Sequence, residues 1–144
     1  MAAEKFLIVL FGATGDLAFR KLLPALCRLH SQGRLARYRV LALGRRDADR
    51  GAYLERLCKA VVGGGQISEE AWSAFEPQIE YFRFDADEAS AFVDLKGKVE
   101  QLERDADLAG RRLFYLSVAP ELFDDIVGGL GGGGLLVRGE HGAG

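Results

Sequence analysis

The stretch FLIVLFGATGDLA, from Phe6 to Ala18, decides the fold. Its first six residues are all apolar, which is typical of a β-strand buried on both faces. Glycines follow at Gly12 and Gly15, and a helical pattern begins soon after. Glycine lets the backbone turn tightly against a phosphate, and a helix start offers N–H donors that lack partners. The stretch therefore predicts a phosphate-binding turn between a buried strand and a helix.

The spacing of this turn is G-x-x-G-x-x-A, so it only partly fits the G-x-G-x-x-G fingerprint. A glycine-rich turn can also be purely structural, but the buried strand before it favours dinucleotide binding. The G-x-x-x-x-G-K-[ST] pattern of a mononucleotide P-loop is absent from the sequence.

The rest of the chain alternates between strand and helix patterns. Further strands are predicted at residues 38–43, 79–84 and 111–118, with a last short one at 135–137. Helical spacing occupies residues 19–29, 48–62 and 92–102, and the first of these helices is expected to bend or restart at Pro24. Two further helices are predicted, a short one capped by Ser68 and one that begins at Pro120. This order predicts a Rossmann-like, doubly wound α/β domain over residues 1–137, whose mainly parallel sheet carries helices on both faces.

Composition narrows the class of protein. The 144 residues suit one domain, and 19 Lys+Arg against 21 Asp+Glu give a net charge of −2, which lacks the basic footprint of a nucleic-acid binder. No apolar run is long enough for a membrane span, and no secretory signal is recognisable. Cys27 and Cys58, with His30 and His141, have no zinc spacing, so we expect buried reduced thiols in a cytoplasmic protein.

Glycine is distributed unevenly. Nine of the 19 glycines fall in the last 17 residues. Because a glycine run loses much backbone entropy on folding and buries nothing, residues 128–144 are expected to form a disordered tail that overlaps the last elements of the domain.

The end of the second predicted strand bears on the choice of coenzyme. A fold that prefers NAD places Asp or Glu there to bind the ribose 2′-hydroxyl, but this chain has Gly44-Arg45-Arg46. The guanidinium fork of Arg45 suits a 2′-phosphate, which predicts NADP. The alternative is that both arginines are solvated and pair with Asp47 and Asp49.

Two other charged residues lie near the glycine turn. Asp16 either caps the helix or contacts the ligand, and Lys21, about one helical turn further, is either solvated or within reach of an anionic ligand. Neither a G-x-S-x-G elbow nor a Tyr followed four positions later by Lys is present.

Residues 12–26, GATGDLAFRKLLPAL, closely resemble the opening motif of glucose-6-phosphate dehydrogenases. Three further matches follow in order: LALGR ending at Arg45, Phe84-Asp85-Ala86, and LFYLSVAP ending at Pro120. The resemblance covers residues 6–130. It implies NADP as coenzyme and oxidation of glucose 6-phosphate to 6-phosphogluconolactone as the reaction of the whole enzyme, in the pentose phosphate pathway.

The resemblance also assigns roles to residues. It implies that the coenzyme pyrophosphate lies on Gly12, Ala13, Thr14, Gly15, Asp16, Leu17, Ala18 and Phe19, the 2′-phosphate on Arg45, and the adenosine beside Asp85 and Ala86. Residues 117–120 would pass close to the nicotinamide, and Lys21 would lie between coenzyme and sugar phosphate.

This sequence departs from the family pattern after residue 130. Gly139 stands where the Glu-Lys-Pro-Phe-Gly motif has its lysine, and the Arg-Ile-Asp-His-Tyr-Leu-Gly-Lys-Glu signature is absent. We therefore expect a fragment without a substrate domain or a catalytic residue, inactive by itself and inclined to self-associate through uncovered apolar surface. The alternative is a stand-alone NADP-binding or redox-sensing module.

Overall fold

A computed structural model describes residues 5–35, 37–108 and 111–135. Its centre is a parallel sheet of four strands in the order β3-β2-β1-β4. The strands are β1 (Lys5–Phe11), β2 (Arg37–Gly44), β3 (Ile79–Arg83) and β4 (Arg112–Leu116). All four were predicted within a few residues, and the parallel α/β class is confirmed.

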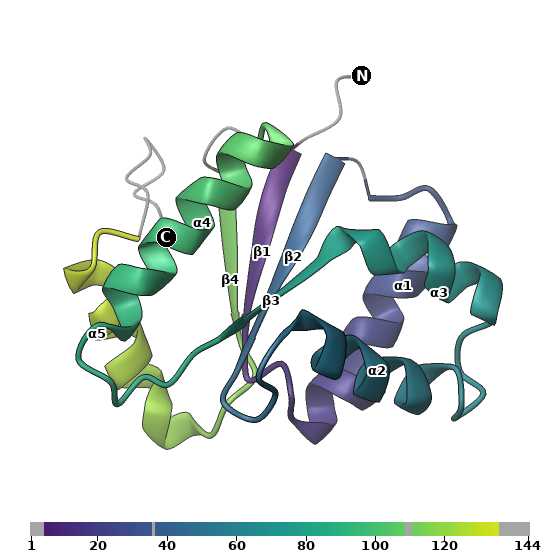
Figure 1. The fold of residues 1–144 in the computed structure, drawn as a ribbon, viewed down its shortest axis with the longest axis horizontal. Coiled ribbons are helices and arrows are strands. Elements are labelled where there is room, and N and C mark those ends of the chain that lie inside the picture. Colours follow the sequence, from purple (N-terminus) through teal and green to yellow (C-terminus); the bar gives the residue numbers. More distant parts are fainter. Residues whose placement is uncertain (1–4, 36, 109–110, 136–144) are drawn as a thin grey trace.

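Helices cover both faces of this sheet (Figure 1). One side carries η1 (Ala18–Leu22), α1 (Leu23–Ser31), α2 (Arg50–Val61) and α3 (Glu69–Phe75), while α4 (Ala91–Ala106) and α5 (Phe123–Gly132) lie on the other. Two short 3-10 turns, η2 (Glu76–Gln78) and η3 (Pro120–Leu122), lead into β3 and α5. No helix in the described ranges is long and apolar enough to cross a membrane.

The sheet separates two hydrophobic cores. Ile8 and Leu10 of β1 point into the core beneath α1, α2 and α3, whereas Leu7, Val9 and Phe11 point into the core beneath α4 and α5. All five side chains are buried, as the apolar run predicted, because β1 lies between two strands and two helical layers.

Local sequence sets several helix boundaries. The Asp49 carboxylate accepts from the Ala52 N–H at 2.9 Å and starts α2, and the Ser68 hydroxyl accepts from the Ala71 N–H at 3.1 Å and starts α3. The restart predicted at Pro24 is also present: η1 is a π-helical turn, and α1 follows it with Pro24 in its first turn.

Two sequence predictions need correction in the described part of the chain. Residues 128–132, assigned to a disordered tail, form the second half of α5, because Ile126 and Leu130 are one helical turn apart and both are buried in the second core. Leu135 is buried but lies in no strand, and the rest of the predicted strand 135–137 is outside the described residues, as are residues 138–144.

The cysteine prediction holds in part. Both thiols are free, and Cys27 is buried, with its sulfur 3.6 Å from the Ala71 carbonyl oxygen. Burial raises the pKa of the Cys27 thiol, so Cys27 remains protonated at neutral pH. Cys58 is only half-buried, because it packs at the margin of the first core and lines an open hollow between α2 and α3.

An ion pair anchors the outer strand. Arg112, at the start of β4, donates to both carboxylate oxygens of Glu103 at 2.7 Å each, and it also donates to the Leu135 carbonyl at 2.6 Å. One side chain therefore ties β4 to the end of α4 and to the segment that leaves α5.

Candidate dinucleotide site

The four strands end around a common cavity of about 370 Å³. Residues at the ends of all four strands contribute to its lining, as expected in an open α/β sheet where the crossovers lead to opposite sides of β1. The lining comprises residues 11, 12, 14 and 15 at and after the end of β1, residues 43–45 at the end of β2, residues 84–87 after β3, and residues 117–119, 122 and 126 after β4.

Gly12 shapes the floor of this cavity. Its φ of +78° lies in the left-handed region, and a Cβ built there would lie 2.7 Å from the Ser117 carbonyl carbon. Only glycine therefore lets the turn after β1 pass this close to the end of β4. A hydrogen bond of 3.1 Å from the Gly15 N–H to the Gly12 carbonyl closes the turn.

The helix after the turn begins at Asp16. Its first bond of the i→i−4 type runs from the Phe19 N–H to the Gly15 carbonyl at 3.1 Å. The N–H groups of residues 16–18 precede that bond and have no acceptor within the helix, which is the arrangement that favours an anion. Asp16 is thus the first helical residue and not the cap, and its carboxylate pairs with Arg20 at 3.1 Å.

Arg45 borders the cavity from the end of β2 and is exposed. The alternative, in which Arg45 pairs with Asp47 or Asp49, is wrong, because both carboxylates have other partners. Asp47 is buried and accepts two hydrogen bonds from Arg56, at 2.8 and 2.9 Å, while Asp49 caps α2. Arg45 makes no ion pair with any residue in the described ranges, so its five donors are available to a ligand.

The remaining polar groups of the lining are few. Thr14 and Ser117 bring hydroxyls, Asp85 and Asp87 bring carboxylates, and Asp85 accepts from the Asp87 N–H at 3.0 Å. Within the part of the chain that the structure describes, no group of three His, Cys, Asp or Glu side chains is placed to hold a metal ion.

The structure brings together most of the residues expected at the site. Gly12, Thr14, Gly15, Arg45, Asp85 and Ala86 line the cavity, with residues 117–119 from the segment expected near the nicotinamide. Other expected residues lie elsewhere: Ala13, Ala18 and Phe19 are buried in the first core, Asp16, Leu17 and Lys21 are exposed on the helix, and Pro120 lies outside the lining. Gly139 is outside the described residues.

Sequence reasoning missed the residues that support the cavity from behind. Tyr53 and Tyr81 are buried, and their hydroxyls reach the two loops that carry the predicted ligand groups. The alternating pattern of β3 places Tyr81 on a buried face, but no local signal in the sequence indicates which backbone it contacts. Leu122 and Ile126 were assigned only to a helix, and they form the apolar wall of the cavity.

Comparison with known proteins gives a consistent result. The model of the family described as glucose-6-phosphate dehydrogenase, NAD binding domain, matches residues 9–142. The glucose-6-phosphate 1-dehydrogenase of Chlamydia pneumoniae is 34% identical over 124 residues, which are 84% of this chain and 24% of that protein. The enzyme of Leuconostoc mesenteroides is 32% identical over 132 residues, or 92% of this chain and 27% of that protein.

Solved structures agree. The glucose-6-phosphate 1-dehydrogenase of Mycobacterium avium superposes with a TM-score of 0.77 at 27% identity, over 93% of this chain and 28% of that one. A glucose-6-phosphate dehydrogenase in complex with its substrate glucose-6-phosphate superposes with a TM-score of 0.76 at 26% identity, over 90% of this chain and 28% of that one. The chain thus spans about a quarter of the length of the relatives it matches.

Proposed function

This chain belongs to the glucose-6-phosphate dehydrogenase family, as its NAD-binding domain, and from that premise we propose that it binds NADP in the cavity at the carboxyl ends of the strands. The pyrophosphate lies against the turn from Gly12 to Gly15 and the start of the following helix. The adenosine lies beside Asp85 and Ala86, and the nicotinamide lies toward residues 117–119. Bound NADP supplies the hydride acceptor.

The observation that carries the choice of NADP over NAD is the environment of Arg45. Arg45 borders the cavity without an acidic partner, because Asp47 is bound to Arg56 and Asp49 to the start of α2. An unpaired guanidinium at the end of the second strand recognises a 2′-phosphate through its fork of donors. A ribose 2′-hydroxyl is better bound by a carboxylate at this position, and Arg45 occupies it here.

We further propose that this domain, comprising residues 1–137, serves the oxidation of glucose 6-phosphate to 6-phosphogluconolactone. Lys21 is exposed on the helix that follows the glycine turn and forms no ion pair with the described residues, which leaves it available to the sugar phosphate. No carboxylate–histidine pair lies in the described lining to accept the proton of the sugar hydroxyl. Hydride transfer therefore requires a proton acceptor from outside the described lining of the cavity.

The alternative of a stand-alone, non-catalytic NADP-binding or redox-sensing module is disfavoured. Thiol-based redox sensors use a solvent-accessible thiol of low pKa, whereas Cys27 is buried and burial raises the pKa of its thiol. The family assignment points to a dehydrogenase domain instead.

Isothermal titration of the chain with NADP and NAD tests the proposal. Arg45→Ala removes charge-assisted hydrogen bonds to the 2′-phosphate, so affinity for NADP is expected to fall about 10- to 100-fold while affinity for NAD stays within about twofold. Arg46→Ala is the matched control, because Arg46 is the adjacent exposed arginine but lies outside the cavity lining. Equal affinity of the parent chain for the two coenzymes contradicts the proposal, as does an equal effect of the two substitutions.

A further inference from the structure

Two buried tyrosines form a stacked pair behind the cavity. Tyr53 comes from α2 and Tyr81 from β3, and their ring centroids lie 4.8 Å apart with 17° between the planes. Tyr53 is fully buried and Tyr81 is 6% exposed, so neither ring reaches a ligand directly. Because tight packing holds both rings, each hydroxyl is fixed relative to the backbone that it contacts.

The Tyr81 hydroxyl closes the loop that carries Arg45. It lies 2.9 Å from the Gly44 carbonyl oxygen and 2.8 Å from the Asp47 carbonyl oxygen, and its one proton is shared between them. These two carbonyls flank Arg45 and Arg46 on either side. The Asp47 carboxylate is separately held by Arg56. Both ends of the two-arginine segment are therefore anchored, while the arginines themselves extend into solvent.

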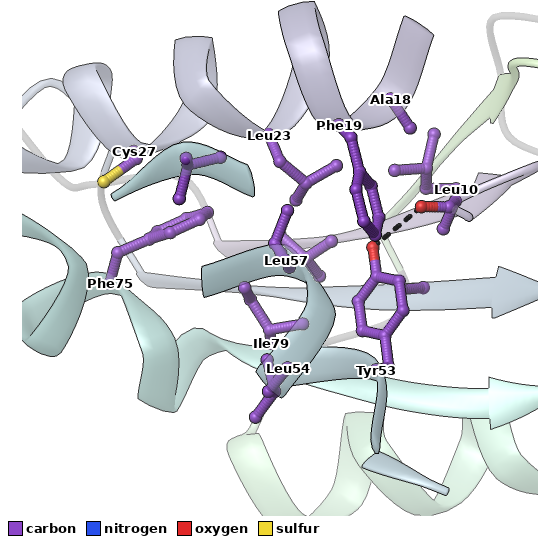
Figure 2. Packing of buried hydrophobic residues seen from close by; sticks show 14 of the residues in the cluster. Leu10, Ala18, Phe19, Leu23, Cys27, Tyr53, Leu54, Leu57, Phe75 and Ile79 are labelled. Carbon is purple, nitrogen blue, oxygen red and sulfur yellow. Dashed lines mark hydrogen bonds between the residues drawn. The ribbon is translucent and has the colours of Figure 1, made fainter. Parts of the chain in front are cut away.

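The Tyr53 hydroxyl is directed at the other loop. It donates to the Ala13 carbonyl oxygen at 3.0 Å, within the glycine turn after β1. Figure 2 shows the Tyr53 ring beside that of Phe19, with this hydrogen bond drawn as a dashed line. Ala13 is also held by a 2.9 Å hydrogen bond from its N–H to the Leu43 carbonyl.

We propose that Tyr81 is a positioning residue for recognition of the coenzyme 2′-phosphate, and that Tyr53 is the equivalent positioning residue for the pyrophosphate turn. Tyr81 acts through the backbone of residues 44–47 on Arg45, and Tyr53 acts through Ala13 on the turn between Gly12 and Gly15. The inference rests on the proposed function, because it assigns a coenzyme phosphate to each loop.

The two hydroxyls remain donors throughout the neutral range. Burial raises the pKa of the Tyr53 phenol and of the Tyr81 phenol, since a phenolate in either place would lose its hydration. A loop that is already fixed before the ligand binds lowers the entropy cost of binding. A mobile loop weakens the affinity for the ligand even when every ligand-contacting residue is intact.

Because the two tyrosines hold different loops, a positioning role can be distinguished experimentally from a merely structural one. NADP and NAD share the pyrophosphate and differ only in the 2′-phosphate, so the ratio of their affinities reports on recognition of the 2′-phosphate. Tyr81→Phe keeps the stacked ring and removes the hydroxyl. We expect affinity for NADP to fall about 3- to 10-fold, with affinity for NAD within about twofold.

Tyr53→Phe is the matched control, since it removes the other buried hydroxyl of the same stack. It is expected to weaken NADP and NAD by equal factors and to leave their ratio unchanged. Thermal melts of both variants report any general loss of stability, which affects the two coenzymes equally. Hydrogen exchange without coenzyme gives a second readout: the peptide covering residues 44–47 is expected to exchange faster in Tyr81→Phe than in Tyr53→Phe.

The outcomes separate this inference from the proposed function. If Arg45→Ala leaves the ratio of the NADP and NAD affinities unchanged, the proposed preference for NADP through Arg45 is wrong. If Arg45→Ala lowers the ratio but Tyr81→Phe leaves both the ratio and the exchange of residues 44–47 unchanged, the positioning role of Tyr81 is overturned. An equal change of the ratio in Tyr81→Phe and Tyr53→Phe overturns the division between the two tyrosines.

Discussion

At the scale of single residues, the site depends on a close approach that the backbone makes at Gly12. The turn after β1 lies against the carbonyl of Ser117, more than a hundred positions away in the sequence, and the left-handed φ of Gly12 is part of that approach. The other glycine of the turn has a different role. A Cβ at Gly15 would lie 3.4 Å from the Gly12 carbonyl oxygen, which the structure tolerates, but Gly15 faces the cavity.

This difference predicts a folding defect for substitution of Gly12 and a binding defect for substitution of Gly15. Gly12→Ala is expected to destabilise the fold by roughly 2–4 kcal/mol, because the new methyl both overlaps the end of β4 and strains the backbone. Gly15→Ala is expected to leave the free energy of unfolding within about 1 kcal/mol and to weaken NADP and NAD alike, since its methyl would occupy the cavity where we propose that the pyrophosphate lies. Urea titrations and calorimetric binding measure the two effects. A stable Gly12→Ala variant would contradict the contact with Ser117.

At the scale of elements, the second half of α5 is the least expected feature. Its residues 128–132 include four glycines, which have poor helix propensity. Burial of Ile126 and Leu130 against the sheet offsets that cost. One of the glycines also has a packing role: a Cβ at Gly129 would lie 2.7 Å from the Phe92 ring atom Cδ2, so α5 lies directly against α4 at that point.

Adjacent glycines in this helix are therefore expected to respond in opposite directions to the same substitution. Gly128 is exposed and a Cβ there meets nothing within 4 Å, so Gly128→Ala is expected to stabilise the chain by about 0.5–1 kcal/mol. Gly129→Ala is expected to destabilise it by about 1–3 kcal/mol, because the Phe92 ring must move. Denaturant unfolding of the two variants measures both values. Equal stabilisation by both substitutions would mean that α5 does not lie against Phe92.

At the scale of the whole molecule, the sheet ends on one side in an incompletely covered strand. β4 is one of the two outer strands of the described sheet, and Leu113 and Tyr115 on it are 54% and 43% exposed. Their register with Ile8 and Leu10 places them on the face that α1, α2 and α3 cover elsewhere. Leu122, Phe123 and Val127 are further exposed apolar side chains after this strand. An outer strand with apolar side chains is a site of association.

We therefore expect the 144-residue chain to self-associate in a concentration-dependent way. Leu113→Lys places a charge on the exposed face of β4 and is expected to shift the chain to monomer in sedimentation velocity experiments. Val93→Lys is the control, because Val93 is 69% exposed on α4, which lies on the opposite face of the sheet from α1, α2 and α3. A parent chain that sediments as a monomer at all concentrations, or equal effects of the two substitutions, would contradict this expectation.

The sequence by itself determined the alternation of strands and helices, the glycine turn after the first strand, and Arg45 at the end of the second strand. Each of these follows from residues that are neighbours along the chain: an apolar run, a glycine spacing, a cap. The extent of α5 was not determined this way, because glycine propensity favoured a tail and only the burial of Ile126 and Leu130 in the assembled core favours the helix.

Only the tertiary structure decided which side chains act together. Asp47 is adjacent to the two arginines in sequence but pairs with Arg56, which leaves Arg45 without an acidic partner in the described chain. Tyr53 and Tyr81 stack from different elements and hold different loops. The stacking of the tyrosines depends on how α2 packs against β3, and the close approach of Gly12 to Ser117 depends on how the end of β1 meets the end of β4. Packing is settled by shape and burial between distant segments, and no local pattern encodes it.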